Sequence, residues 1–200
     1  MKAAPAAECG DCLYGVIFMI WEESFMANRP AAHTIRTLAF AALLLTLGLV
    51  LPFLTGQIPQ FGSMLLPMHL PVLLCGFVCS WPWGLAVGAV TPLLRSLLFA
   101  MPPMFPTALA MAFELAAYGC CTGLLYRRLP RNTPMLYVAL VVSMLVGRIV
   151  WAAATYCITG TMTMQAFLAG AFLNAWPGII AQLLLVPPLV LALRRAGFAE

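Results

Sequence analysis

Six long apolar segments constrain the fold of this chain more than any other feature. They cover residues 35–53, 64–80, 83–100, 106–126, 134–158 and 165–193. Each is close in length to the roughly 20 apolar residues that a helix needs to cross a bilayer. Only 8% of the residues are charged, against about 25% in soluble domains. The sequence therefore predicts an all-α integral membrane protein, a single compact bundle of six transmembrane helices.

The second segment and the small residues give the sequence further structural signals. Pro67 and Pro71 fall at the beginning of segment 64–80, so this helix is expected to bend or to start late. Small residues four apart let helix backbones approach closely. Three such pairs predict helix contacts: Gly84 and Gly88, Ala112 and Ala116, and Gly119 and Gly123.

The basic residues near the segment ends predict the orientation of the bundle. They flank the first segment and follow the fourth and sixth, as Arg29, Arg36, Arg127, Arg128, Arg131, Arg194 and Arg195. The connections 54–63, 101–105 and 159–164 carry no charge. Because basic residues accumulate on the cytoplasmic side, both termini are expected in the cytoplasm. These residues are too few and too scattered for a nucleic-acid surface.

Five polar residues interrupt the apolar segments, and these are the candidate binding residues: His69, Arg95, Glu114, Arg148 and Asn174. A charge in hydrocarbon costs about 2.5–3.5 kcal/mol even on lenient scales, so it usually faces a partner or a cavity. Counted along the predicted helices, all five fall in the outer half of the bilayer. Two arginines face one glutamate, which favours an anionic ligand. The alternative is an internal Arg–Glu–Arg network that only ties the bundle together.

Three further residues are candidates for lining the outer end of such a site. Trp151 lies deep enough in its helix to contact a ligand, and Gln57 and Gln60 lie in the first outer connection. No residue has a predicted catalytic or metal-binding role. The spans contain one acid, no metal-binding histidine pair and no Ser–His dyad, so an intramembrane enzyme is disfavoured.

A series of motifs resembles a known family. In order, they are Pro67-Met68-His69-Leu70-Pro71-Val72, Pro82-x-Gly84-x-x-x-Gly88, Pro92, Met101-Pro102-Pro103, Glu114-Leu115-Ala116-x-Tyr118-Gly119, Gly147-Arg148 and Asn174-Ala175-x-Pro177-Gly178. They resemble the substrate-binding S component of energy-coupling factor (ECF) vitamin transporters over roughly residues 34–195. The resemblance implies a multi-pass protein of the bacterial cytoplasmic membrane. It also implies two kinds of partner, a scaffold membrane subunit and two ATPase subunits.

The resemblance implies a docking face on the first helix as well. Members of the family typically carry two alanines four apart there, where the scaffold subunit docks. This chain has Ala39, Ala42 and Thr46 at helical spacing, with threonine in place of the second alanine. Internal packing is the alternative role of this face. The chain has no P-loop and needs no cofactor of its own, since ATP would be used by the partner subunits.

The function that these observations predict is the capture of a small, anionic vitamin or vitamin precursor from outside the cell. Pantothenate is favoured because it has one carboxylate and a flexible polar body, and folate remains open. The alternative is a stand-alone, proton-coupled secondary transporter that uses Glu114 as its proton carrier. No internal repeat of the kind that such carriers often show is visible.

Residues 1–25 differ from the rest of the chain. They hold four of the six acids, and their apolar run Leu13–Trp21 is too short to span a membrane. Trp21-Glu22-Glu23 can be encoded by a ribosome-binding sequence just before Met26. Translation is therefore expected to start at Met26, which makes residues 1–25 a non-native leader or a disordered segment and residues 26–200 the membrane domain.

Overall fold

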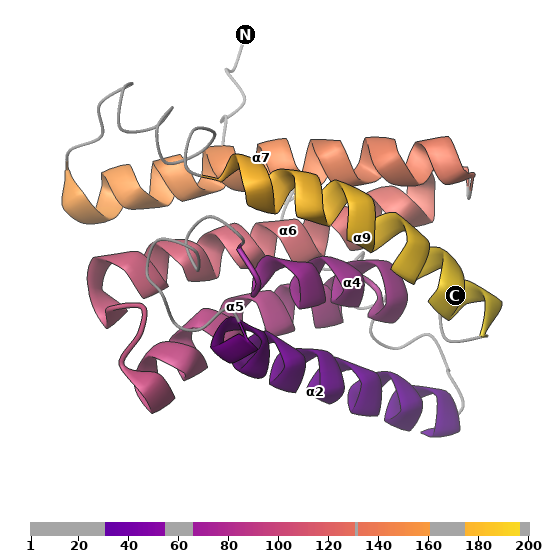
Figure 1. Cartoon of the computed structure of the whole chain (residues 1–200), viewed down its shortest axis with the longest axis horizontal. Helices are drawn as coiled ribbons and strands as arrows, with labels where there is room; N and C mark the ends of the chain where they lie inside the picture. Colours follow the sequence, from indigo (N-terminus) through magenta and orange to yellow (C-terminus); the bar gives the residue numbers. More distant parts are fainter. Residues whose placement is uncertain (1–30, 55–65, 131, 161–174, 197–200) are drawn as a thin grey trace, which may run out of the picture. The chain divides into compact units, whose positions relative to one another are not determined.

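The computed structural model describes residues 31–54, 66–130, 132–160 and 175–196 (Figure 1). Every regular element within these ranges is a helix. In chain order they are α2 (Ala31–Leu54), α4 (His69–Cys79), α5 (Trp81–Phe99), the π-helical turn η1 (Met104–Ala108), α6 (Leu109–Arg128), α7 (Thr133–Thr159) and α9 (Trp176–Arg195). The predicted leader, the start at Met26 and the first part of segment 165–193 lie outside the described residues. The all-helical prediction is confirmed for the part that is described.

Five helical segments are long and apolar enough to cross a membrane. They are Thr34–Phe53, Trp81–Phe99, Met104–Arg128, Thr133–Thr159 and Trp176–Arg195. The remaining helix, α4, has only 11 residues. It begins at His69 rather than at residue 64, so the prediction of a late start is confirmed. Pro71 is tolerated as the third residue of α4, because an N–H group in the first turn has no partner within the helix.

Three glycines bring α4, α5 and α6 into backbone contact. A Cβ atom added to Gly76 would lie 2.6 Å from the Gly119 carbonyl oxygen, and one added to Gly84 would lie 2.5 Å from the same atom. A Cβ on Gly119 would in turn meet the Gly84 backbone. No side chain fits at these points, so the predicted close approach at Gly84 and Gly119 is confirmed. We call these three residues the glycine contact.

The close approaches also fix how α5 and α6 are aligned. Along α5, Trp81 meets Gly123, Gly84 meets Gly119, and Gly88 meets Leu115. Successive positions on α5 thus meet earlier positions on α6, which makes the two helices antiparallel. This alignment determines which polar side chains of the two helices lie at the same depth.

Helix α6 lies at the centre of the described bundle, since α4, α5 and α7 all contact it. Helix α9 contacts α4 and α7. The buried residues Val72, Leu73, Leu115, Leu136 and Leu140 form part of one hydrophobic core among these helices. Figure 1 shows α4, α5 and α6 as neighbouring helices.

The chain divides after Arg36 into two compact units, Met1–Arg36 and Thr37–Glu200. Of the first unit, the structure describes only Ala31–Arg36, which is the beginning of α2. In the second unit α2 continues with Ala41, Leu44, Gly48 and Pro52 buried.

Candidate functional site

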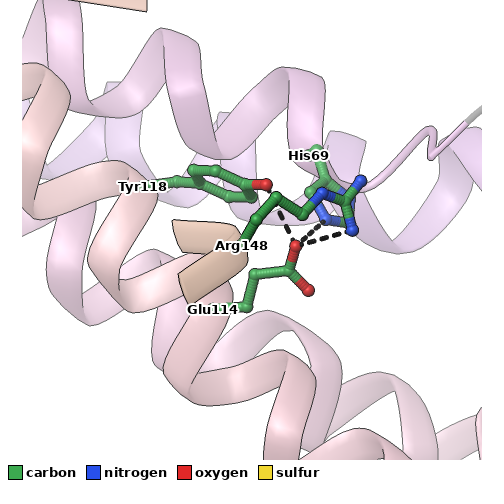
Figure 2. A network of polar contacts seen from close by, with 4 residues as sticks. All are labelled: His69, Glu114, Tyr118 and Arg148. Carbon is green, nitrogen blue, oxygen red and sulfur yellow. Dashed lines mark hydrogen bonds and ion pairs between the residues drawn. The ribbon is translucent and has the colours of Figure 1, made fainter. Parts of the chain in front are cut away.

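Glu114 is the centre of a buried polar network. Its side chain is 2% exposed, in the second turn of α6. Its Oε1 atom lies 3.0 Å from Arg148 Nη1 and accepts a hydrogen bond of 3.0 Å from the Tyr118 hydroxyl. His69 Nε2 is 3.6 Å from the same oxygen. Figure 2 shows His69, Tyr118 and Arg148 converging on this oxygen, and we call the four residues the Glu114 network.

Three helices position these side chains. Glu114 and Tyr118 are four residues apart on α6, so they lie on one face of that helix. Arg148 comes from α7, where Gly147 lets the helix lie against the Tyr118 ring: a Cβ there would be 2.6 Å from Cδ1. His69 is the first residue of α4, and its ring meets the Tyr118 ring edge-on at 5.4 Å.

The network is electrostatically paired but has donors left over. A buried Arg–Glu pair is tolerable only where geometry and further hydrogen bonds are good, and Tyr118 supplies such a bond. Arg148 Nη2 is buried and has no hydrogen-bond partner among the described residues. The same holds for both ring nitrogens of His69. An unsatisfied buried donor or acceptor costs about 1–3 kcal/mol, and an acceptor oxygen of a ligand would remove that cost for Arg148 Nη2 and for the His69 nitrogen that carries a proton.

Arg95 lies apart from this network. It is buried, but its Nη1 donates to the Leu49 carbonyl of α2 at 2.9 Å. Its guanidinium lies 5.4 Å from the centre of the Phe53 ring and 5.9 Å from that of Phe99. Within the described part of the chain, no ion pair joins it to Glu114.

The helix alignment explains the separation. Gly88 meets Leu115, so Arg95 lies about six residues, or roughly 9 Å, beyond the level of Glu114. Among the described residues Glu114 pairs with Arg148 and not with Arg95, so the alternative of a three-residue Arg–Glu–Arg network does not form. Without Arg95, no excess of positive charge surrounds Glu114 among the described residues. The reason to expect an acceptor ligand is instead that Arg148 and His69 have nitrogens without hydrogen-bond partners there.

The other predicted site residues fall into two groups. Trp151 is half-buried on α7, one turn beyond Arg148 on the same face. Asn174, Gln57 and Gln60 lie outside the described residues.

The predicted docking residues lie on the open side of α2. Ala39, Ala42 and Thr46 are all exposed, and the Thr46 hydroxyl donates to the Ala42 carbonyl at 2.8 Å. Among the described residues this face is therefore not packed inside the bundle.

Three residues with polar atoms near or facing the bundle interior were not predicted. Tyr118 binds Glu114 directly, yet a tyrosine in an apolar helix reads as a core residue. Gln182 on α9 is 2% exposed, and its Nε2 has no partner among the described residues. A polar amide within an apolar segment could have marked Gln182 as a candidate site residue from the sequence. Thr155, two turns after Arg148, likewise has a buried hydroxyl with no partner in the described chain.

The described residues contain no group of three or more His, Cys, Asp or Glu side chains that could hold a metal ion. The Glu114 network offers a buried carboxylate, a guanidinium with one donor to spare, and an imidazole that lies 3.6 Å from the carboxylate and makes no hydrogen bond among the described residues.

Comparison with known proteins identifies the family of the chain. Searches of curated proteins and of solved structures found no match to the chain. One family model matches residues 36–190, which include the whole Glu114 network. The matching model describes the substrate-specific component of the ECF transporter, and the chain belongs to this family.

Proposed function

We propose that the Glu114 network of this substrate-binding membrane subunit holds the anionic group of a small, vitamin-like solute captured from outside the cell. The observation that carries the proposal is Arg148: one guanidinium nitrogen is used by Glu114 and the other is buried without a partner in the described chain. A carboxylate would accept from that nitrogen and from His69. Pantothenate fits because it combines one carboxylate with a flexible polar body.

Membership of the family supports the proposal that this chain works with partner subunits. ECF substrate-specific components are substrate-binding subunits of transporters rather than enzymes, and they act with a scaffold membrane subunit and ATPase subunits. We propose that this chain crosses the bacterial cytoplasmic membrane six times, with both termini inside. We propose the face of Ala39, Ala42 and Thr46 as the place where the scaffold docks, because it is exposed on α2.

The test begins with the purified chain in nanodiscs. Mass spectrometry identifies the bound solute, and calorimetric titration measures its affinity in the natural chain and in Arg148→Lys. Lysine keeps the charge that pairs with Glu114 but removes the second nitrogen. The lost charge-assisted hydrogen bond is worth about 1.5–3 kcal/mol, so affinity should fall roughly tenfold to a hundredfold. Unchanged affinity would place the binding site elsewhere.

A transport assay separates the proposal from its main alternative. Expressed without scaffold and ATPase subunits, the chain should bind the solute but not accumulate it against a gradient. Uphill uptake by the chain alone, in step with the proton gradient, would instead show a secondary transporter that uses Glu114.

A further inference from the structure

A second polar site lies far from the Glu114 network. A cavity of about 300 Å³ is lined by Gly76–Val78 and Ser80 at the end of α4, and by Gly123, Tyr126 and Arg127 on α6. Tyr126 follows Glu114 by 12 residues on α6, which is roughly 18 Å of helix. Nothing in the proposed solute capture uses this cavity. We call it the Arg127 cavity.

The cavity is lined by hydrogen-bond donors, one of which is buried without a partner among the described residues. Arg127 lies in the last turn of α6 and is exposed. Tyr126 is only 6% exposed, and its hydroxyl has no partner among the described residues. Its ring is held perpendicular to that of Phe77 at 5.3 Å. Helix α5 starts beside Ser80, whose side chain makes no capping bond, so the first N–H groups of α5 add positive potential.

The cavity also offers acceptors. Helices α5, α6, α7 and α9 each end in a backbone capping bond, whereas the described structure shows none at Ser80, which follows α4. The last four carbonyl groups of a helix have no partner within it. In α4 these include the carbonyls of Gly76–Val78, which line the cavity.

A ligand that satisfies both sides carries anionic oxygens together with hydrogen-bond donors such as O–H groups. We propose that the Arg127 cavity binds a phosphoglycerol group. Its phosphate accepts from Arg127 and from the Tyr126 hydroxyl, while its glycerol hydroxyls donate to the carbonyl end of α4. The same chemistry occurs in the headgroup of phosphatidylglycerol and in soluble glycerol 3-phosphate. Basic pockets between membrane helices are a known form of anionic-lipid site.

The chain supplies a matched control, because Arg128 is also exposed in the last turn of α6 but does not line the cavity. Native mass spectrometry would count phosphatidylglycerol and phosphatidylcholine bound from an equal mixture. Arg127→Gln should lower the preference for phosphatidylglycerol about fivefold. Tyr126→Phe should lower it roughly two- to tenfold, and Arg128→Gln should leave it unchanged.

A second measurement distinguishes the two sources of the phosphate. The full chain in phosphatidylcholine nanodiscs is titrated with glycerol 3-phosphate, and its melting temperature is followed. An increase that Arg127→Gln removes and Arg128→Gln keeps supports a site open to the soluble compound. Lipid preference without such an increase supports a headgroup site.

Two results would overturn the proposal. Equal loss of lipid preference in the Arg127 and Arg128 variants would show general attraction of a basic surface. No response to either phosphate source would show that Arg127 merely caps the end of its own helix. If Arg127→Gln does not fold, Tyr126→Phe decides alone, since it removes a single oxygen atom. Neither result affects the assignment of the Glu114 network.

Discussion

Helices α6 and α2 are both apolar and long enough to span a bilayer, but they are held in very different ways. In the apolar 18-residue stretch of the Met104–Arg128 span, half of the residues are buried. In that of the Thr34–Phe53 span, 17% are buried. Helix α6 touches its neighbours through backbone at the glycine contact. Helix α2 instead exposes the large apolar residues Ile35, Leu38, Leu43, Leu47 and Val50.

The difference follows from the solvent. In lipid an exposed leucine costs nothing, so burial of apolar area does not drive helices together, and close packing of small residues does. Helix α6 has that packing, and of the five long apolar helices it is the most buried. It also carries Glu114, so the candidate site stands on the most closely packed helix. Within the described part of the chain, the contacts of α2 include Gly48 against Thr91 and Arg95 with the Leu49 carbonyl.

The largest expected effect is at the centre. Arg148→Gln leaves Glu114 buried without its counter-charge, which typically destabilises a protein by 3–5 kcal/mol. Since Arg95 does not reach Glu114, it cannot replace the lost partner. We expect a large drop in yield and in the melting temperature measured in detergent. Arg148→Lys is the control and should retain most of the stability. A fully stable Arg148→Gln variant would show that another group neutralises Glu114.

The glycine contact should give the next largest effect. In Gly119→Ala the added methyl group meets the Gly84 backbone, which cannot rotate away as a side chain can. Overpacking of this kind costs about 1–3 kcal/mol, and thermal melting in detergent would measure it. The matched control is Ala42→Leu on exposed α2, which should change stability by less than about 0.5 kcal/mol. Equal melting temperatures in both variants would contradict the difference in packing between α6 and α2.

A smaller effect is expected where α2 is attached. Arg95→Met removes the hydrogen bond to the Leu49 carbonyl and keeps much of the side-chain volume. Amide hydrogen exchange in α2 should become faster by roughly tenfold, because the free energy that a charge-assisted hydrogen bond contributes corresponds to about that factor. Solute affinity should stay within about twofold. If affinity instead falls as far as in Arg148→Lys, Arg95 belongs to the binding site after all.

The smallest effect on stability is expected for Ala42→Leu, which should nevertheless reduce uptake. Ala42→Leu adds bulk to the exposed face of α2, so solute binding by the chain alone should be unchanged while uptake with scaffold and ATPase subunits falls. Leu47→Phe enlarges another exposed position on α2 and serves as the control. Equal loss of uptake in the two variants would remove the docking role of the Ala42 face.

The sequence alone was sufficient for features that depend on one helix at a time. Apolar length predicted the five helices that are long enough to span a membrane, Pro67 and Pro71 predicted the late start of α4, and the glycine spacing predicted contact points. Depth along each helix also brought Glu114 and Arg148 to a common level. What failed was the partner of Arg95, because that depends on how two helices are aligned. The contact of Gly84 with Gly119 sets this alignment, and no pattern within either helix reveals it.

The short length of α4 has an electrical consequence for the Glu114 network. Eleven residues cover about 17 Å, roughly half of a 30 Å hydrocarbon layer, so α4 alone is too short to cross it. Its first residue, His69, has a buried side chain whose Nε2 lies 3.6 Å from the Glu114 carboxylate. The positive end of the peptide dipoles of α4 is thus the end that carries the buried His69–Glu114 contact. In partly buried settings such an end stabilises a negative charge by up to about 2 kcal/mol, and salt in the surrounding water cannot screen it there.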